Sequence, residues 1–356
     1  MLLSLLYSAP GRANPYYDPA KPHHTKEGFR NNYPHDPPGS FLAWQWERIR
    51  DGLPKDAPPD YRTPTVAADL AWLRANRTET SLTWIGHATF LLQTGGMNVL
   101  TDPQFSERAS PVSFAGPRRK VPAAIALQDL PRIDLVVVSH NHYDHLDRAS
   151  VKALNAQPGG PPLFLVPLGL KPWFAREDIA NVVELDWWQE HRAGALTGHL
   201  LPVQHWSTRT GGDRNETLWG GWLVDGPSFR FFFAGDTGYS DDFKDIGRRF
   251  PGINLAAIPI GAYAPRWFMK WAHANPDDAV RIHQDLGAGQ SVGMHWGTFQ
   301  LTDESLDEPP RVLTEALRKA DVSPLRFFVM AIGETRHYPV AARPLAGPDA
   351  PPTGNR

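Results

Sequence analysis

The hydrophobic positions of this 356-residue chain fall into short apolar runs that are separated by polar turns. The run at 133–138, Ile-Asp-Leu-Val-Val-Val, is β-branched and nearly all apolar, which predicts a strand buried on both faces. Other apolar runs predict strands at 82–85, 89–93, 98–101, 163–166, 182–185, 200–203, 218–224, 229–233, 255–260, 291–294 and 326–329.

Helices are expected between two batches of these strands. Ser40 is a suitable N-cap for the first helix, Pro64 precedes the second, and Asp147 is interpreted as the cap of the third rather than as a ligand. The predicted helices lie at 41–49, 65–75, 148–154 and at about 240–250, 276–286 and 310–320. This order favours an α/β (α+β) fold in which two mixed sheets pack face to face with helices outside.

No linker divides the chain into independent domains. Residues 1–39 are rich in Pro, Tyr, His and Asn and predict an extended N-terminal arm. Residues 40–342 are predicted to form one domain, and 343–356 a Pro-rich tail. Within the arm, the pair His23–His24 is expected to be exposed rather than to bind a metal.

Composition excludes several functions. The 36 basic and 38 acidic residues give a net charge of −2 without a basic face, so no nucleic-acid binding is expected. Cysteine is absent, so any metal must be held by His, Asp or Glu. The apolar start at 1–9 is too short for a membrane span and lacks a basic region. Cytoplasmic, peripheral membrane and, if this start is a truncated signal, periplasmic locations stay open.

A cluster of metal-binding side chains directly follows the central apolar run. His140, His142, Asp144 and His145 stand where this strand leaves its sheet, which is where open α/β sheets place ligands. His140 and His142 point to the same side of an extended segment because they are two residues apart. Asp144 and His145 are adjacent and diverge, so they can serve a second ion.

Three more ligands are expected at strand ends. His205, Asp236 and His295 each follow an apolar strand directly, and this shared position is the informative feature. The Asp236 carboxylate is expected to bridge, since its two oxygens can reach ions about 3.5 Å apart. The remaining ligands form two sets of three, one per ion: His140, His142 and His205, and Asp144, His145 and His295. Imidazole-rich ligation favours two Zn²⁺ ions, with iron and manganese left open.

Two other polar features are assigned no function. His87, in a turn between two strands, is expected to be structural. The basic stretch at 118–120 predicts a solvated face rather than an anion site.

The pattern His-x-His-x-Asp-His with a later His, Asp and His resembles the metallo-β-lactamase superfamily, whose fold is an αβ/βα sandwich. Longer motifs narrow the resemblance to the N-acylphosphatidylethanolamine-hydrolysing phospholipases D, and the similarity runs from roughly 31 to 328. These motifs stand at 84–89, 100–103, 139–147, 184–188, 235–239, 256–263, 265–270, 279–283 and 295–299.

The resemblance implies the same metal ligands and a phospholipid substrate, hydrolysed to phosphatidic acid and an N-acylethanolamine by attack of a metal-bridging hydroxide on phosphorus. It also matches His273 to a histidine near the scissile phosphate and Tyr143 to a tyrosine beside the metals. With Asp144, these are the expected catalytic residues. The alternatives are that His273 caps the following helix and that Tyr143 only packs.

Other functions remain open. A related hydrolase of a sugar-phosphate lactone or of another phosphodiester would use the same ligands. A metal-stabilised scaffold is the non-enzymatic alternative, and the full ligand set argues against it. The segment 266–271 mixes basic and aromatic residues, as a lipid-facing rim or a packed core would, so peripheral membrane contact stays open, as does a homodimer.

Overall fold

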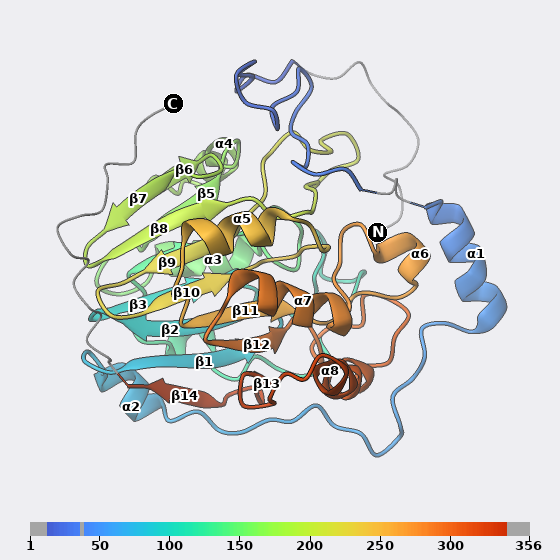
Figure 1. Ribbon diagram of the computed structural model, residues 1–356. Coiled ribbons are helices and arrows are strands. Elements are labelled where there is room, and N and C mark those ends of the chain that lie inside the picture. The colour runs from blue at the N-terminus through green and yellow to red at the C-terminus, as the bar shows by residue number, and fades with distance from the viewer. Residues whose placement is uncertain (1–12, 36–38, 340–356) are drawn as a thin grey trace.

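Two seven-stranded mixed sheets pack face to face at the centre of the computed structural model, which describes residues 13–35 and 39–339 (Figure 1). The first sheet has the order β14-β1-β2-β3-β4-β5-β6, antiparallel from β14 to β3 and parallel from β3 to β6. Its strands are β1 (Thr80–Gly86), β2 (Thr89–Thr94), β3 (Met97–Thr101), β4 (Leu135–Val137), β5 (Leu163–Pro167), β6 (Val182–Leu185) and β14 (Thr335–Tyr338).

The second sheet has the order β13-β12-β11-β10-β9-β8-β7. It is antiparallel from β7 to β10 and parallel from β10 to β13. Its strands are β7 (Glu190–Ala193), β8 (Leu196–Leu201), β9 (Gly221–Asp225), β10 (Arg230–Phe233), β11 (Leu255–Pro259), β12 (Gln290–Met294) and β13 (Phe327–Val329).

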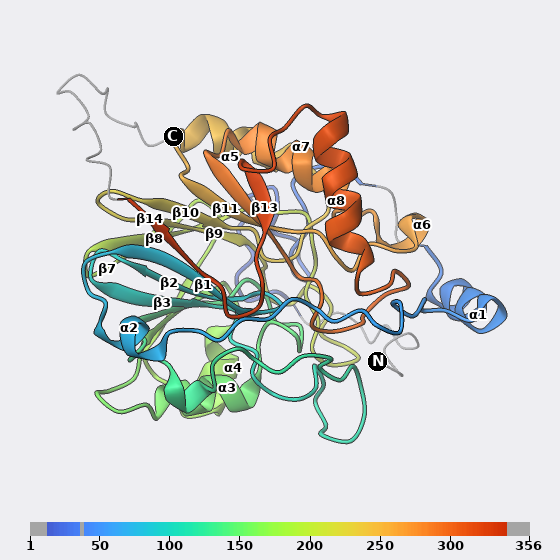
Figure 2. The ribbon, with the colours of Figure 1, turned by 90° about the horizontal axis from the view of Figure 1, so that it is seen from below.

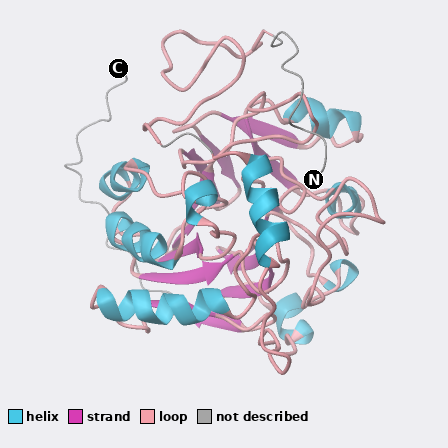
Figure 3. Ribbon diagram, turned by 90° about the vertical axis from the view of Figure 1, so that its right-hand side faces the viewer, coloured by secondary structure: helices cyan, strands magenta, loops and turns pink. Residues whose placement is uncertain are grey.

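Helices cover the outer faces of both sheets, which gives four layers (Figure 2). The outer layer of the first sheet has α2 (Leu70–Ala75), α3 (Arg148–Asn155) and α4 (Lys171–Arg176). The outer layer of the second has α5 (Asp242–Arg249), α7 (Pro276–Leu286) and α8 (Glu308–Lys319). The strands thus lie at the centre and the helices around them (Figure 3). The 3₁₀ turn Leu127–Asp129 packs beside α3, and α1 (Phe41–Asp51) and α6 (Arg266–Met269) lie outside these layers.

Alternate residues of β4 face two different cores. Leu135 and Val137 belong to the large core that includes both sheets, and Val136 belongs to a smaller core beneath α3 and α4. A strand buried on both faces needs the continuous apolar run that the sequence shows. The αβ/βα sandwich predicted from the sequence is therefore confirmed.

The structure also confirms individual caps. The Asp147 carboxylate accepts a hydrogen bond from the backbone N–H of Ser150 at the start of α3. Asn275 and Asp278 form a reciprocal capping box at the start of α7, and Gly287 ends this helix in the left-handed conformation.

Some predicted elements differ from the structure. The helix predicted at 65–75 begins only at Leu70, because Asp69 caps it, and Thr65 instead pairs with Ile332. Strand β14 was not predicted, since Thr-Arg-His-Tyr has no apolar run and becomes a strand by pairing with β1. Strand β7 and helices α4 and α6 were not predicted either.

The prediction that His23 and His24 are exposed is wrong. Both side chains are buried, because their rings pack against aromatic residues and their nitrogens lie against the Asp186 carboxylate. The start at 1–9 and the tail at 343–356 lie outside the described residues, and the domain boundaries stay a prediction. None of the helices in the described ranges combines the length and hydropathy that a membrane crossing needs.

Candidate metal centre

The segment after β4 brings the first ligands together at the carboxyl edge of the first sheet. The backbone N–H of Ser139 donates to Asp102 Oδ1 at 2.7 Å, which fixes the segment as it leaves the strand. The chain then turns, because the N–H groups of His145 and Leu146 both donate to the carbonyl of His142. This turn places the imidazoles and the Asp144 carboxylate on the inner side of the loop.

His140, His142 and His205 form the first ligand group. His140 Nε2 lies 2.8 Å from His142 Nδ1, and His205 Nε2 lies 3.4 Å from the same atom. Burial lowers the pKa of His142 to about 4 and holds the pKa values of His140 and His205 well below the usual value. Neutral imidazoles that converge in this way are the form in which histidine binds a metal ion.

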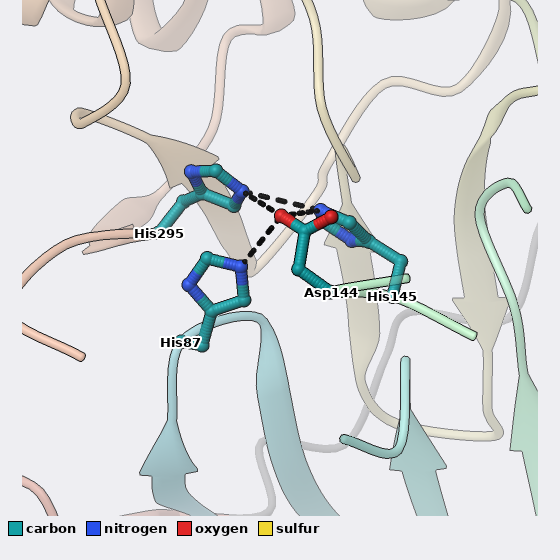
Figure 4. A group of neighbouring side chains, drawn as sticks. All are labelled: His87, Asp144, His145 and His295. Atoms are coloured by element: carbon teal, nitrogen blue, oxygen red, sulfur yellow. Dashed lines mark hydrogen bonds and ion pairs between the residues drawn. The ribbon is translucent and has the colours of Figure 1, made fainter. Parts of the chain in front are cut away.

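Asp144, His145 and His295 form the second ligand group (Figure 4). Asp144 Oδ2 lies 3.3 Å from Nε2 of both His145 and His295, and these two nitrogens are 3.1 Å apart. His295 has a positive φ of 62°, which turns its side chain back toward the loop after β4.

Asp236 lies between the two groups. Its Oδ2 is 3.2 Å from His145 Nε2 and 3.9 Å from His205 Nε2, and its Oδ1 is 3.0 Å from His295 Nε2. Gly235 permits this approach, because a Cβ atom at that position would lie 2.5 Å from the Ser139 Cβ, and φ is +62°. A single carboxylate thus contacts both predicted ligand sets.

A second layer of hydrogen bonds orients the imidazoles. His145 Nδ1 lies 2.6 Å from Asp102 Oδ2, and His205 Nδ1 lies 2.9 Å from the carbonyl oxygen of Ala272. His140 Nδ1 lies 2.8 Å from Ser139 Oγ. Because these outer contacts engage Nδ1, each ring directs Nε2 inward, as metal-binding histidines do.

The buried carboxylates of the site also attract cations. Burial opposes a charge on His295, but the Asp236 and Asp144 carboxylates outweigh burial and raise its pKa to about 9. Burial raises the pKa of Asp236, but attraction to His145 and His295 holds it well below its usual range. A divalent ion can replace the protons that these buried carboxylates attract. The residues present therefore fit divalent metal ions.

His273 lies beside the Asp236 carboxylate. Its Nδ1 is 3.9 Å from Asp236 Oδ2, and this buried nitrogen has no hydrogen-bond partner within the described residues. Burial lowers the pKa of His273 to about 4. The alternative that it caps the following helix is excluded, because Asn275 caps α7.

Tyr143 makes contacts that brace the loop after β4. Its hydroxyl donates to the backbone carbonyl of Arg209 at 2.8 Å, and the Arg209 guanidinium lies over its ring at 4.2 Å. Arg209 in turn donates to the carbonyls of Asn141 and Leu146. These contacts support the alternative that Tyr143 only packs. A catalytic role for Tyr143 stays a prediction.

Two residues of the centre were missed. His87, expected to be structural, has its Nε2 3.0 Å from Asp144 Oδ2 and its ring centroid 4.0 Å from that of His295. Asp102, whose carboxylate holds His145, follows β3 directly. The strand-end position that identified Asp236 was also the available signal for Asp102.

The solvated face predicted at 118–120 is only partly right. Arg118 is exposed and pairs with Glu107. Arg119 packs against the Phe299 ring at 5.1 Å and donates to Gln104, because the backbone N–H of Lys120 donates to Thr298 and ties the loop to this part of the chain.

Comparison with known proteins supports the fold and the site. Residues 97–296 match the family described as "Beta-lactamase superfamily domain". The chain is 44% identical over 265 residues to N-acyl-phosphatidylethanolamine-hydrolyzing phospholipase D 1 of Caenorhabditis elegans, covering 71% of this chain and 74% of that protein. It is 37% identical over 238 residues to the mitochondrial phospholipase D of the same name from Saccharomyces cerevisiae, covering 65% of this chain and 50% of that protein.

Among solved structures, an isothiocyanate hydrolase from Delia radicum gut bacteria shares the fold, with a TM-score of 0.59 at 22% identity. The alignment covers 73% of this chain and 100% of that one. The family match spans both ligand groups and Asp236, and it begins after His87. The chain therefore belongs to the β-lactamase superfamily of metal-dependent hydrolases and, within it, to the family of the N-acyl-phosphatidylethanolamine-hydrolysing phospholipases D.

Proposed function

We propose that this protein is a dinuclear zinc phosphodiesterase that hydrolyses N-acylphosphatidylethanolamine to phosphatidic acid and an N-acylethanolamine. The observation that carries the proposal is the position of Asp236, whose carboxylate contacts His145, His205 and His295. One ion would be held by His140, His142 and His205, the other by Asp144, His145 and His295, with Asp236 shared. The names of the relatives supply the substrate class.

Bound divalent ions would lower the pKa of water and stabilise negative charge on phosphoryl oxygens, which is the chemistry that phosphodiester hydrolysis needs. The imidazole-rich, thiolate-free donor set favours zinc over iron or manganese. In this proposal, water attacks phosphorus and the N-acylethanolamine oxygen leaves. Asp144 would bind the ion nearer to His87, whose Nε2 lies 3.0 Å from Asp144 Oδ2.

We assign His273 the role of proton donor to the leaving oxygen. It lies beside Asp236 and belongs to neither ligand group. Its buried Nδ1 has no hydrogen-bond partner among the described residues. Burial lowers its pKa to about 4, and a bound phosphodiester anion would raise that pKa by attraction. A proton donor helps here because the leaving group is an alkoxide.

We also propose peripheral contact with the membrane that contains the substrate. Leu42, Trp46 and Ile49 are exposed and lie on one face of α1, at helical spacing. Helix α1 projects at the right of Figure 1 beside α6, where Trp267 Nε1 donates to Glu47 at 3.0 Å. An exposed apolar stripe of this kind suits a lipid surface. Replacing Trp46 with Ser should weaken sedimentation with phospholipid vesicles while leaving turnover of detergent-dispersed substrate unchanged.

Product analysis tests the proposed substrate. The metal-loaded protein is incubated with N-acyl phosphatidylethanolamines, sugar-phosphate lactones and cyclic nucleotides, and the products are identified by mass. We expect phosphatidic acid and the N-acylethanolamine from the first class. Turnover of only a lactone or a cyclic nucleotide would contradict the substrate assignment and would leave the metal centre in place.

A further inference from the structure

A second cluster of metal-binding side chains lies where the N-terminal arm meets the end of β6. Asp186 follows β6 directly, and both His23 and His24 come from the arm. His23 Nε2 is 2.7 Å from Asp186 Oδ1, and His24 Nε2 is 3.0 Å from Asp186 Oδ2. One ligand atom of each residue lies within 4.8 Å of the others, and all three residues are buried. The cluster shares no residue with the candidate metal centre.

The backbone carbonyl of Tyr16 orients the His24 ring. It lies 2.8 Å from His24 Nδ1, whereas the Asp18 N–H is farther from this nitrogen, at 3.2 Å. A proton on Nδ1 satisfies the nearer carbonyl and leaves Nε2 facing the carboxylate. The 3.0 Å between Nε2 and Asp186 Oδ2 suits a shared proton, as in an imidazolium–carboxylate pair, and it equally suits a metal ion that both atoms bind. The same outward bond to a carbonyl orients His205 in the candidate metal centre.

Aromatic contacts hold the two imidazoles in place. The His23 ring stacks on Trp187 at a centroid distance of 4.5 Å, and the His24 ring meets the edge of Phe29 at 5.0 Å. The rings are therefore already oriented toward Asp186, and little conformational entropy is lost when an ion binds.

Lys21 is the competing cation. Its ammonium group lies 2.6 Å from Asp186 Oδ2. The Lys21 side chain is 37% exposed, whereas those of Asp186 and His24 are 3% and 1% exposed. The ammonium group thus reaches the carboxylate from the surface, and it can return to solvent when an ion enters by the same route.

We propose that His23, His24 and Asp186 bind one divalent metal ion of the zinc class, which fastens the N-terminal arm to the domain. Two imidazoles and one carboxylate form a donor set that suits zinc. The site has a structural role, since it joins an arm whose described residues belong to no helix or sheet strand to the end of the edge strand β6. The inference goes beyond the proposed function and does not depend on it.

Metal counting tests the proposal. The full chain is stripped with a chelator, reloaded with zinc, separated from free zinc and subjected to elemental analysis. We expect three ions per chain, two at the candidate metal centre and one here. His24→Gln should lose one ion. The matched control His337→Gln, which removes an exposed histidine that pairs with Glu79, should keep all three.

A Lys21→Met variant separates a metal site from a plain ion-pair cluster. If zinc binds here, this variant binds as many ions as the wild type, and the zinc that fills the site last raises the melting temperatures of both. If Lys21 is instead the only cation that the cluster accepts, the variant melts lower than the wild type, and it binds no zinc beyond the ions of the candidate metal centre. That second result would overturn the proposal even if His24→Gln fails to fold.

Discussion

Asn31 of the N-terminal arm hydrogen-bonds to both backbone polar groups of His205. The Asn31 Nδ2 donates to the His205 carbonyl at 3.0 Å, and the His205 N–H donates to Asn31 Oδ1 at 3.0 Å. The indole N–H of Trp219 lies 3.2 Å from the same Oδ1. These contacts fix where the His205 side chain leaves the backbone, so the arm supports one ligand of the candidate metal centre.

Replacing Asn31 with Ala should weaken zinc binding at the candidate metal centre by roughly 10- to 100-fold, because outer contacts that orient a ligand have effects of this size. A zinc titration against a competing chelator measures the change. Asn32→Ala is the matched control, since the Asn32 amide donates to Asp242, which is not a proposed ligand. Equal zinc affinity in the two variants would show that the arm does not support the centre.

Asp236→Asn keeps the shape of the side chain and removes its negative charge, which in our proposal is shared by the two ions. We expect loss of both ions of the centre and of hydrolysis, with the fold retained, as circular dichroism and elemental analysis would show. Near-normal turnover at full metal content would mean that Asp236 does not bridge.

His273→Ala should behave differently from Asp236→Asn, because His273 is assigned a proton-transfer role and no ion. We expect unchanged metal content and a fall in kcat of about 100-fold or more, which is the usual contribution of a positioned acid. Loss of an ion from this variant would instead make His273 a ligand.

Asp102→Ala removes the carboxylate that lies 2.6 Å from His145 Nδ1. The ring of His145 can then rotate, so we expect zinc affinity to fall roughly 10- to 100-fold. Asp147→Ala is the control, since it removes a carboxylate that caps α3 and accepts hydrogen bonds from Ser106 but none from a proposed ligand. It should lower the free energy of unfolding by about 1 kcal/mol or more and leave zinc affinity unchanged. Matching zinc affinities would argue that Asp102 is purely structural.

Features that a local pattern determines could be predicted from the sequence. His140, His142, Asp144 and His145 follow a continuous apolar strand, and strand ends meet at one edge of a sheet, so their proximity could be expected. The caps of α3 and α7 were likewise visible, because a cap depends on residues within one turn.

The features that the sequence did not reveal depend on contacts between distant segments. His23 and His24 stand in a polar arm, and nothing nearby in the sequence shows that Asp186 lies against them, 162 residues or more away. The Asn31–His205 contact joins residues 174 apart. Strand β14 has no apolar run of its own and forms because β1 offers an unpaired edge.

The direct test of the central claim is hydrolysis of N-acylphosphatidylethanolamine in oxygen-18 water, with both products identified by mass. A centre that stabilises charge on phosphoryl oxygens favours attack at phosphorus, because attack at carbon would develop charge farther from that centre. The account predicts one oxygen-18 atom in phosphatidic acid and none in the N-acylethanolamine. Label in the N-acylethanolamine would show attack at carbon and would contradict the account.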